Sequence, residues 1–218
     1  LCSPAYASQP VSSAIACALD YSSSMRPSEL GWMLAGMRDV IAGPRFAERI
    51  EASRHHQVAV CFYWFATKPQ VPIIPWRLLR ASDGSVGELV DDLDAIVTGQ
   101  VYPSGIGQAT KLDAAVDFGV GQLMGGMPWE ADRLVVDVQS DGTNSGGVAS
   151  LHRSRDRADA LGVEVNAIVV GTDTNYDEAR LRDYYHANLV TSIGRVYVAS
   201  DAVSFRKAWS QKIFMEMV

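Results

Sequence analysis

The stretch SAIACALDYSSS, residues 13–24, decides the fold. It begins with a short apolar run, Ser13–Leu19, which predicts a buried strand. The loop that follows carries a carboxylate at Asp20 and hydroxyls at Ser22 and Ser24. Because alternate residues of extended backbone point to the same side, these three side chains are expected to face one point. The stretch therefore predicts a strand that ends in an oxygen-rich loop.

Strands and helices alternate along the rest of the chain. Further strands are expected at His56–Phe65, Val71–Pro75, Arg133–Val138, Val163–Val170 and Arg195–Ala199. Helices are expected at Ser28–Ala42, Ser85–Val97, Thr110–Met124, Val148–Leu161, Tyr176–Leu189 and Ala202–Met217. Prolines restrict Val71–Pro75 to an edge position, as one arm of a hairpin. The alternation predicts an α/β fold with a mostly parallel central sheet, one antiparallel edge strand and helices on both faces.

The composition indicates one globular domain and excludes two kinds of partner. Of 218 residues, 48% are hydrophobic and 20% are charged, and the net charge is -6. We divide the chain into an N-terminal segment, residues 1–12, and one domain, residues 13–218. No cluster of Lys and Arg offers a surface for nucleic acid. Apolar runs such as Val58–Phe65 are far shorter than the ~20 residues of a membrane-spanning helix, so no transmembrane segment is expected.

The N-terminal residues indicate export. The sequence begins with Leu1, and Ala5-Tyr6-Ala7 has the small-x-small form of a secretory cleavage site, which is typical of the remnant of an export signal. The three cysteines cannot all pair within one chain, and Cys17 and Cys61 fall in predicted buried strands, so no disulfide framework is expected. For Cys2, an ordinary N-terminal residue is favoured over a lipid anchor or an intermolecular thiol.

Two further loops bring oxygen atoms to the same edge of the predicted sheet. In open sheets of this kind, ligands bind beyond the carboxyl ends of the strands, near the point where strand order reverses. The loop Ser104–Ala109 delivers Thr110 to the start of a helix, and the loop Ser140–Asn144 supplies Asp141 just after a strand. The candidate metal ligands are Asp20, Ser22, Ser24, Thr110 and Asp141.

The chemistry of this set favours a hard cation. Two carboxylates and three hydroxyls suit Mg²⁺, Mn²⁺ or Ca²⁺, and the set has none of the nitrogen or sulfur that zinc prefers. Asp20 and Asp141 bring only two negative charges, so an ion that binds both can still attract a carboxylate or phosphate. Helix N-termini near Thr110 and Ser145 are expected to add positive potential there.

The three loops together resemble the metal-ion-dependent adhesion site of von Willebrand factor A domains. The matching segments are Asp20-x-Ser22-x-Ser24, then Thr110-Lys-Leu112-Asp-Ala-Ala115, then Leu134–Val136 leading to Asp141-Gly142. The resemblance covers the chain from Ser13 onward and implies the Rossmann-like fold of that family. It also implies that the site binds Mg²⁺ or Mn²⁺ and captures an acidic group of a protein ligand.

Finer details are most similar to a bacterial family of exported A-like domains. They are Pro75-Trp76, Asp141-Gly-Thr-Asn144 and Asp183-Tyr184-Tyr185. This resemblance implies an extracytoplasmic location, periplasmic or secreted. The sequence departs from the A-domain pattern at one place: the family usually has glycine within the two residues before the second-loop Thr, whereas Gln108 and Ala109 stand here.

Two alternatives concern the site itself. Ser104 competes with Thr110 for the second-loop position, and Thr110 is favoured because Leu112 and Ala115 give it the helix start that Ser104 lacks. The same side chains could instead cap the following helices and close turns, as Ser, Thr and Asp routinely do. That alternative leaves unexplained why all three loops share one edge.

The expected function is a metal-dependent protein-binding module, whose partner offers an acidic side chain to the ion. One alternative is a structural subunit of a larger extracytoplasmic, membrane-associated assembly with a vestigial site. A Mg²⁺-dependent hydrolase is disfavoured, since Ser23 has no histidine beside it and Ser22 replaces the second Asp of aspartate-nucleophile phosphatases, so no enzyme activity is expected. The pair His55-His56 precedes a strand, which predicts a place at the opposite edge of the sheet.

Overall fold

The computed structural model describes residues 10–69, 72–99, 107–171 and 177–217. The expectations for Cys2, for Ala5-Tyr6-Ala7 and for Ser104 lie outside these residues. No helix within the described ranges has the length and apolar character needed to cross a membrane.

The fold is an α/β sandwich built on one sheet. Its strands are β1 (Ala14–Asp20), β2 (Val58–Phe65), β3 (Ile74–Leu79), β4 (Leu134–Ser140), β5 (Val163–Val170) and β6 (Val196–Ala199). The helices are α1 (Pro27–Ala42), α2 (Pro44–Glu51), α3 (Ser85–Gly99), α4 (Leu112–Gly121), α5 (Val148–Ala160), α6 (Glu178–Asn188) and α7 (Ala202–Glu216), with a π-helical turn at Gln122–Gly126 after α4. The strand order is β3-β2-β1-β4-β5-β6, and β3 alone among the paired strands runs antiparallel to its neighbour. The predicted fold class is confirmed.

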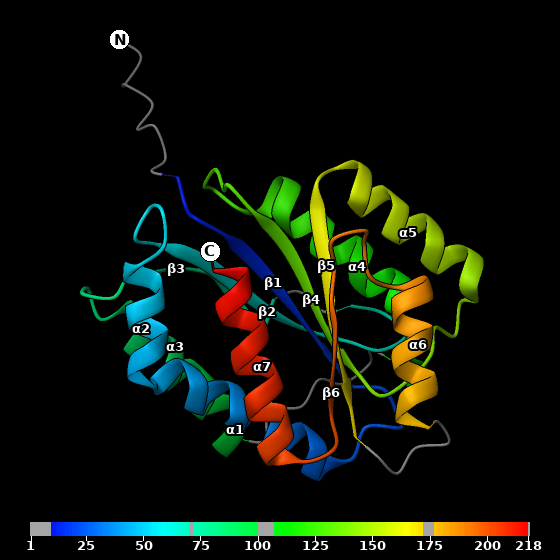
Figure 1. The fold of residues 1–218 in the computed structure, drawn as a ribbon. Helices are drawn as coiled ribbons and strands as arrows, with labels where there is room; N and C mark the ends of the chain where they lie inside the picture. The colour runs from blue at the N-terminus through cyan, green and yellow to red at the C-terminus, as the bar shows by residue number, and fades with distance from the viewer. Residues whose placement is uncertain (1–9, 70–71, 100–106, 172–176, 218) are drawn as a thin grey trace.

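Helices cover both faces of the sheet (Figure 1). One face packs against α1, α2, α3 and α7, and the other packs against α4, α5 and α6. The central strands β1 and β4 are buried over almost their whole length, because both of their faces meet a helical layer. This explains why their sequences read as continuous apolar runs rather than as alternating patterns.

The edge strand lies later in the chain than Val71–Pro75, which was the expected range. It occupies Ile74–Leu79 and pairs with β2 at Phe62↔Ile74 and Val58↔Leu79, with a shift in register after Val60. Pro75 is exposed next to this irregularity, where a residue without a backbone N–H is tolerated. The prolines therefore predicted the edge position correctly but not where the strand begins.

The helix α2 was not expected from the sequence. It follows α1 after the single residue Gly43 and begins with Pro44, whose fixed φ suits a first helical position. Only Phe46 and Ile50 of its eight residues are buried. Two apolar side chains give too weak a periodic pattern to distinguish so short a helix from a loop.

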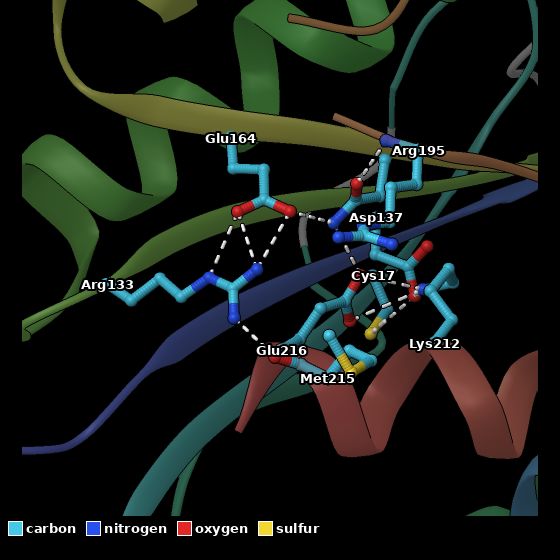
Figure 2. Close-up of polar contacts among 9 residues, drawn as sticks. Cys17, Arg133, Asp137, Glu164, Arg195, Lys212, Met215 and Glu216 are labelled. Atoms are coloured by element: carbon cyan, nitrogen blue, oxygen red, sulfur yellow. Dashed lines mark hydrogen bonds and ion pairs between the residues drawn. The ribbon is translucent and has the colours of Figure 1, made fainter. Parts of the chain in front are cut away.

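A cluster of buried charges lies between the sheet and α7 (Figure 2). The ammonium of Lys212 forms an ion pair with Asp137 of β4 and lies 3.1 Å from Glu216 Oε1, and all three side chains are at most 1% exposed. Asn166 of β5 donates to Glu216 at 2.8 Å and to Glu164 at 2.7 Å. The cluster thus joins the C-terminal half of α7 to β4 and β5.

Burial and pairing act in opposite directions on the cluster. Burial raises the pKa of Glu216 to about 8 and also raises the pKa of Asp137. Burial alone would lower the pKa of Lys212, but the neighbouring Asp137 and Glu216 carboxylates more than offset it and raise that pKa. Lys212 therefore stays charged, and the negative charge of Asp137 depends on it.

Replacing Lys212 by Met is expected to destabilise the domain by about 3–5 kcal/mol, because it leaves the carboxylate of Asp137 buried without a cation. Urea unfolding, followed by tryptophan fluorescence, measures the loss. The matched control is Arg54→Met, which breaks an ion pair with Asp132 whose Arg side chain is 76% exposed, and it should lower stability by under about 1 kcal/mol. Equal losses in the two variants would contradict the role given to Lys212.

Candidate metal site

The site lies where the two central strands end. β1 and β4 are parallel neighbours, paired as far as Leu19↔Gln139, so the loops that follow them leave the sheet at the same edge. From β1 the sheet continues to β2 on one side and to β4 on the other, which makes this the point where strand order reverses. Loops diverge at such a point and leave room for a ligand.

The structure brings the predicted hydroxyls together in one continuous chain of hydrogen bonds. Thr110 Oγ1 donates to Ser22 Oγ at 3.0 Å, and Ser22 Oγ lies 3.0 Å from Ser24 Oγ. Ser24 Oγ in turn donates to Asp141 Oδ1 at 2.7 Å. Side chains from three loops that are distant in sequence therefore have their oxygen atoms within hydrogen-bond distance of one another.

Asp20 joins the same group through the start of its own loop. Its Oδ1 accepts a hydrogen bond from the Ser22 backbone N–H at 2.7 Å, and its Oδ2 accepts one from Ser140 Oγ at 2.5 Å. The first bond curves the loop so that Ser22 faces back toward the sheet edge. Ser140 was not among the predicted residues, although its place at the last position of β4, directly before Asp141, was a signal that could have marked it.

One carboxylate oxygen in the group has no hydrogen-bond partner. Asp141 Oδ2 is buried and receives no hydrogen bond within the described residues, although its residue is only 1% exposed. A buried carboxylate oxygen without a donor is costly unless a cation or water satisfies it. This orphaned oxygen, in an all-oxygen group, fits a hard divalent cation.

Burial disfavours the charged forms of both carboxylates. Burial, together with the neighbouring charge of Asp141, raises the pKa of Asp20 to about 7. Burial likewise raises the pKa of Asp141 to about 6, with a contribution from Glu29 in the first turn of α1. Raised pKa values at two buried carboxyl groups show that no side chain in the described part of the protein compensates their negative charge. A bound cation would supply that compensation.

The third loop approaches the second so closely that only glycine fits at position 142. A Cβ on Gly142 would lie 2.8 Å from Thr110 Oγ1. The Gly142 carbonyl accepts a hydrogen bond from the buried hydroxyl of Tyr185 at 2.8 Å, and this bond fixes the loop to α6. Tyr185 is therefore a positioning residue for Asp141 and Thr110.

The second loop, which lacks the expected glycine at positions 108 and 109, contains a glycine at position 107 instead. Gly107 stands three residues before Thr110 and has a positive φ of 86°, so the glycine occurs one position earlier than the pattern expects. Its Cα packs against Thr67, whose Oγ1 accepts hydrogen bonds from the backbone N–H groups of Gln108 and Ala109 at 3.1 Å each. Thr67, just after β2, thus holds the loop that presents Thr110.

The capping alternative does not account for the hydroxyls. The N-cap of α1 is Arg26, whose backbone N–H donates to Glu29, and the N-cap of α4 is Lys111 with no side-chain cap. Ser22, Ser24 and Thr110 make no capping bond to these helices and instead bond to one another and to Asp141. Turn closure accounts for only one contact of Asp20, the hydrogen bond that its carboxylate accepts from the Ser22 N–H.

Nitrogen and sulfur ligands are absent from this part of the molecule. Within the described ranges, no three His, Cys, Asp or Glu side chains gather in a way that could hold a metal. As expected, His55 lies at the other edge of the sheet, with its Nε2 2.9 Å from Asp132 Oδ2. His152 bonds to Asn188 between α5 and α6. Cys17 and Cys61 are buried as free thiols.

Comparison with solved structures defines the class of fold. The chain is similar to the von Willebrand factor A domain of SpRpn10, with a TM-score of 0.56, 13% identity, and coverage of 90% of this chain and 94% of that chain. It is similar to proximal thread matrix protein 1 from the mussel byssus, with a zinc-occupied MIDAS motif, at a TM-score of 0.56, 20% identity and coverage of 97% and 46%. It is also similar to the pilus adhesin SpaC from Lactobacillus rhamnosus GG in its open conformation, at a TM-score of 0.60, 13% identity and coverage of 96% and 30%. The chain thus has the von Willebrand factor A fold and spans less than half the length of the latter two proteins.

The family is defined by sequence. Residues 10–218 match the family described as protein of unknown function DUF1194, and the chain belongs to that family. A search of curated proteins gives no match.

Replacing Asp141 by Asn is expected to stabilise the metal-free domain at pH 8 by about 1–3 kcal/mol, because it removes a buried negative charge beside Asp20. The raised pKa values mean that the folded state binds these protons at higher pH than the unfolded state does. The stability of the unsubstituted protein in EDTA should therefore increase as the pH falls from 8 to 5, and Asp141→Asn should show a smaller increase. Chemical unfolding across this pH range measures both effects.

The control for this prediction is Asp113→Asn in the first turn of α4. Partial burial alone would raise the pKa of Asp113, but hydrogen bonds from Ser150 and Asn144 outweigh it and lower that pKa. Its ionised form is therefore favoured by folding, and Asp113→Asn should destabilise the domain or leave it unchanged. A gain in stability from Asp113→Asn equal to that from Asp141→Asn would show that the effect is not specific to the site.

Proposed function

We propose that this domain is a metal-dependent protein-binding module. Its ion is a hard divalent cation, Mg²⁺, Mn²⁺ or Ca²⁺, and its partner is a protein that completes the coordination with an acidic side chain. The residues that would hold the ion are Asp20, Ser22, Ser24, Thr110 and Asp141. The observation that carries the proposal is the convergence of three loops on one group of oxygens that includes the orphaned Asp141 Oδ2.

Charge balance supports the acidic nature of the partner. The candidate ligand set holds two carboxylates, and its other oxygens are neutral hydroxyls. Two carboxylates balance the charge of a divalent ion only formally, and the hydroxyl ligands add no negative charge, so an ion with an open coordination position still attracts a further anionic oxygen. Ser23, exposed in the same loop, leaves the surface beside the group open to an incoming side chain.

Similar structures support binding rather than catalysis. One is a pilus adhesin, and another is a byssus matrix protein with zinc in its MIDAS motif. Hydrolysis at a metal needs a general base or a nucleophile held by a base near the ion. Ser23 Oγ instead donates to the Gln108 carbonyl, and the His152 ring bonds to Asn188.

An extracytoplasmic location, periplasmic or secreted, accompanies the proposal. It is supported by the presence of a pilus adhesin and a byssus matrix protein among the similar structures. A structural subunit of a larger membrane-associated assembly, in which the metal group is vestigial, is the second candidate function. The similarity to parts of a longer pilus adhesin and a longer byssus matrix protein favours an assembly in either case.

Mg²⁺ or Mn²⁺ is expected to bind the domain with one ion per chain. If the ion binds only the folded state, a concentration ~100 times its dissociation constant adds about 2.7 kcal/mol of stability. Calorimetric titration and thermal unfolding measure the two effects, Asp20→Asn and Asp141→Asn should abolish both, and Asp113→Asn should retain both. Absence of cation binding, or equal binding by the Asp20 and Asp141 variants, would contradict the site.

A partner captured from the native envelope is expected to depend on the ion. The immobilised domain is incubated with an envelope extract in Mn²⁺ and then washed with EDTA, which should release the partner because its carboxylate is held through the metal. Asp141→Asn should capture none, while Asp113→Asn should capture as much as the unsubstituted domain. Specific capture that survives EDTA would favour the structural subunit instead.

A further inference from the structure

We propose that a pocket beside the metal group selects partners in which an apolar side chain directly adjoins the metal-binding carboxylate. This inference rests on the proposed function and names the chemistry of its partner. The pocket lies between the loop after β1, the first turn of α1 and the end of the second loop, and has a volume of about 440 Å³. A cavity of this size accommodates a large side chain and is typical of recognition sites.

The floor of the pocket is apolar and backed by the core. Met25 and Leu30, at 6% and 3% exposed, belong to the core cluster beneath α1. Tyr21 forms one wall and packs its ring against the buried Trp64, with ring centroids 5.7 Å apart. Pro27 contributes an apolar rim. Contact with this floor would remove apolar surface of a partner from water, which is favourable in proportion to the area buried.

The pocket and the metal group share Ser22. The Ser22 hydroxyl bonds to Thr110 and Ser24, while its carbonyl accepts the Met25 N–H at 3.1 Å and so turns the chain toward the pocket floor. Ser22 itself lines the pocket. A partner whose carboxylate reaches the ion therefore places its neighbouring residue over the pocket where the partner's backbone turns at the carboxylate, because consecutive Cα atoms lie only about 3.8 Å apart. In an extended segment the two neighbouring side chains would instead point to opposite faces.

The pocket walls are fixed by hydrogen bonds. The backbone N–H of Ser23 donates to the Gln108 carbonyl at 2.9 Å, and Ser23 Oγ donates to the same carbonyl at 3.3 Å. The Gln108 N–H is in turn held by Thr67. A wall that is already ordered costs little further entropy on binding, so the apolar contact contributes to affinity.

The chemistry of the pocket favours a neutral occupant. Its described lining, from Tyr21, Ser22, Ser23, Met25, Pro27, Leu30, Gly107 and Gln108, contains no charged side chain. The opposite side of Thr110 differs, because the charged ends of Lys111 and Asp113 flank Gly146 there. The uncharged lining on the pocket side therefore suits an aliphatic or aromatic side chain beside the partner's carboxylate.

The experiment is a selection with a random twelve-residue peptide library displayed on phage. The library is bound to the domain in Mn²⁺, eluted with EDTA and sequenced. We expect recovered peptides to contain Asp or Glu directly next to Leu, Ile, Met, Phe or Tyr. A synthetic peptide of the consensus, in which serine replaces that apolar residue, should bind about tenfold more weakly in a fluorescence anisotropy titration.

The test variant is Ser23→Trp, which fills the pocket from an exposed position outside the metal-binding set, and its matched control is Ser145→Trp, exposed in the third loop. Calorimetry with Mn²⁺ alone first establishes that both variants still bind the ion. Ser23→Trp should lose the roughly tenfold preference for the apolar neighbour, whereas Ser145→Trp should keep it.

The outcomes separate the pocket from the proposed function. Peptides that elute with EDTA and share an acidic residue without an apolar neighbour would overturn the pocket and leave the metal-dependent function standing. Failure of EDTA to elute any peptide, together with absent Mn²⁺ binding, would overturn both. Mn²⁺-dependent self-association that Ser23→Trp abolishes would place a second copy of this chain in the pocket and would overturn the assignment to a distinct partner.

Discussion

Two carboxylates, Asp20 and Asp141, are held together out of water because β1 and β4 are parallel neighbours that end at the same edge. Their mutual repulsion and their burial oppose folding, and the chain supplies hydroxyls rather than a Lys or Arg to the group. A protein optimised for stability alone would place neutral residues there. The arrangement is understandable when an external cation is part of the folded domain, and the loops, Tyr185 and Thr67 then act as its supports.

A buried ion pair on one face of the sheet helps to hold β4, the strand that precedes Asp141, in place. The buried pair Lys212 and Asp137 ties α7 to β4, four residues before Asp141, on the face opposite to α4 and α5. Such a pair contributes little net stability compared with apolar residues of similar size, but a shift of α7 that separated Lys212 from Asp137 would leave a buried charge unpaired. It therefore specifies the position of α7 against the strand that carries Asp141.

The sequence predicted the features that depend on short patterns. The run Ser13–Leu19 followed by Asp20 predicted the strand and its loop. The alternation of elements predicted a mostly parallel sheet and the shared edge of the three loops. The sequence did not predict the bounds of β3, because Pro75 excludes a hydrogen bond at one position without marking the ends of a strand. It also did not predict the partners of Asp137, since Lys212 and Asn166 lie on elements far along the chain and share no local pattern with it.

In partner recognition, metal coordination would supply affinity and the pocket would supply selectivity. A divalent ion attracts any carboxylate, and acidic side chains are common on protein surfaces, so the ion alone gives affinity with little selectivity. An apolar floor at Met25 and Leu30 rejects charged or strongly hydrated neighbours, because these would lose water without gaining a partner. Because Ser22 belongs to both features, the two contacts are made by adjacent residues of one partner segment, and selectivity follows from the geometry of a single loop.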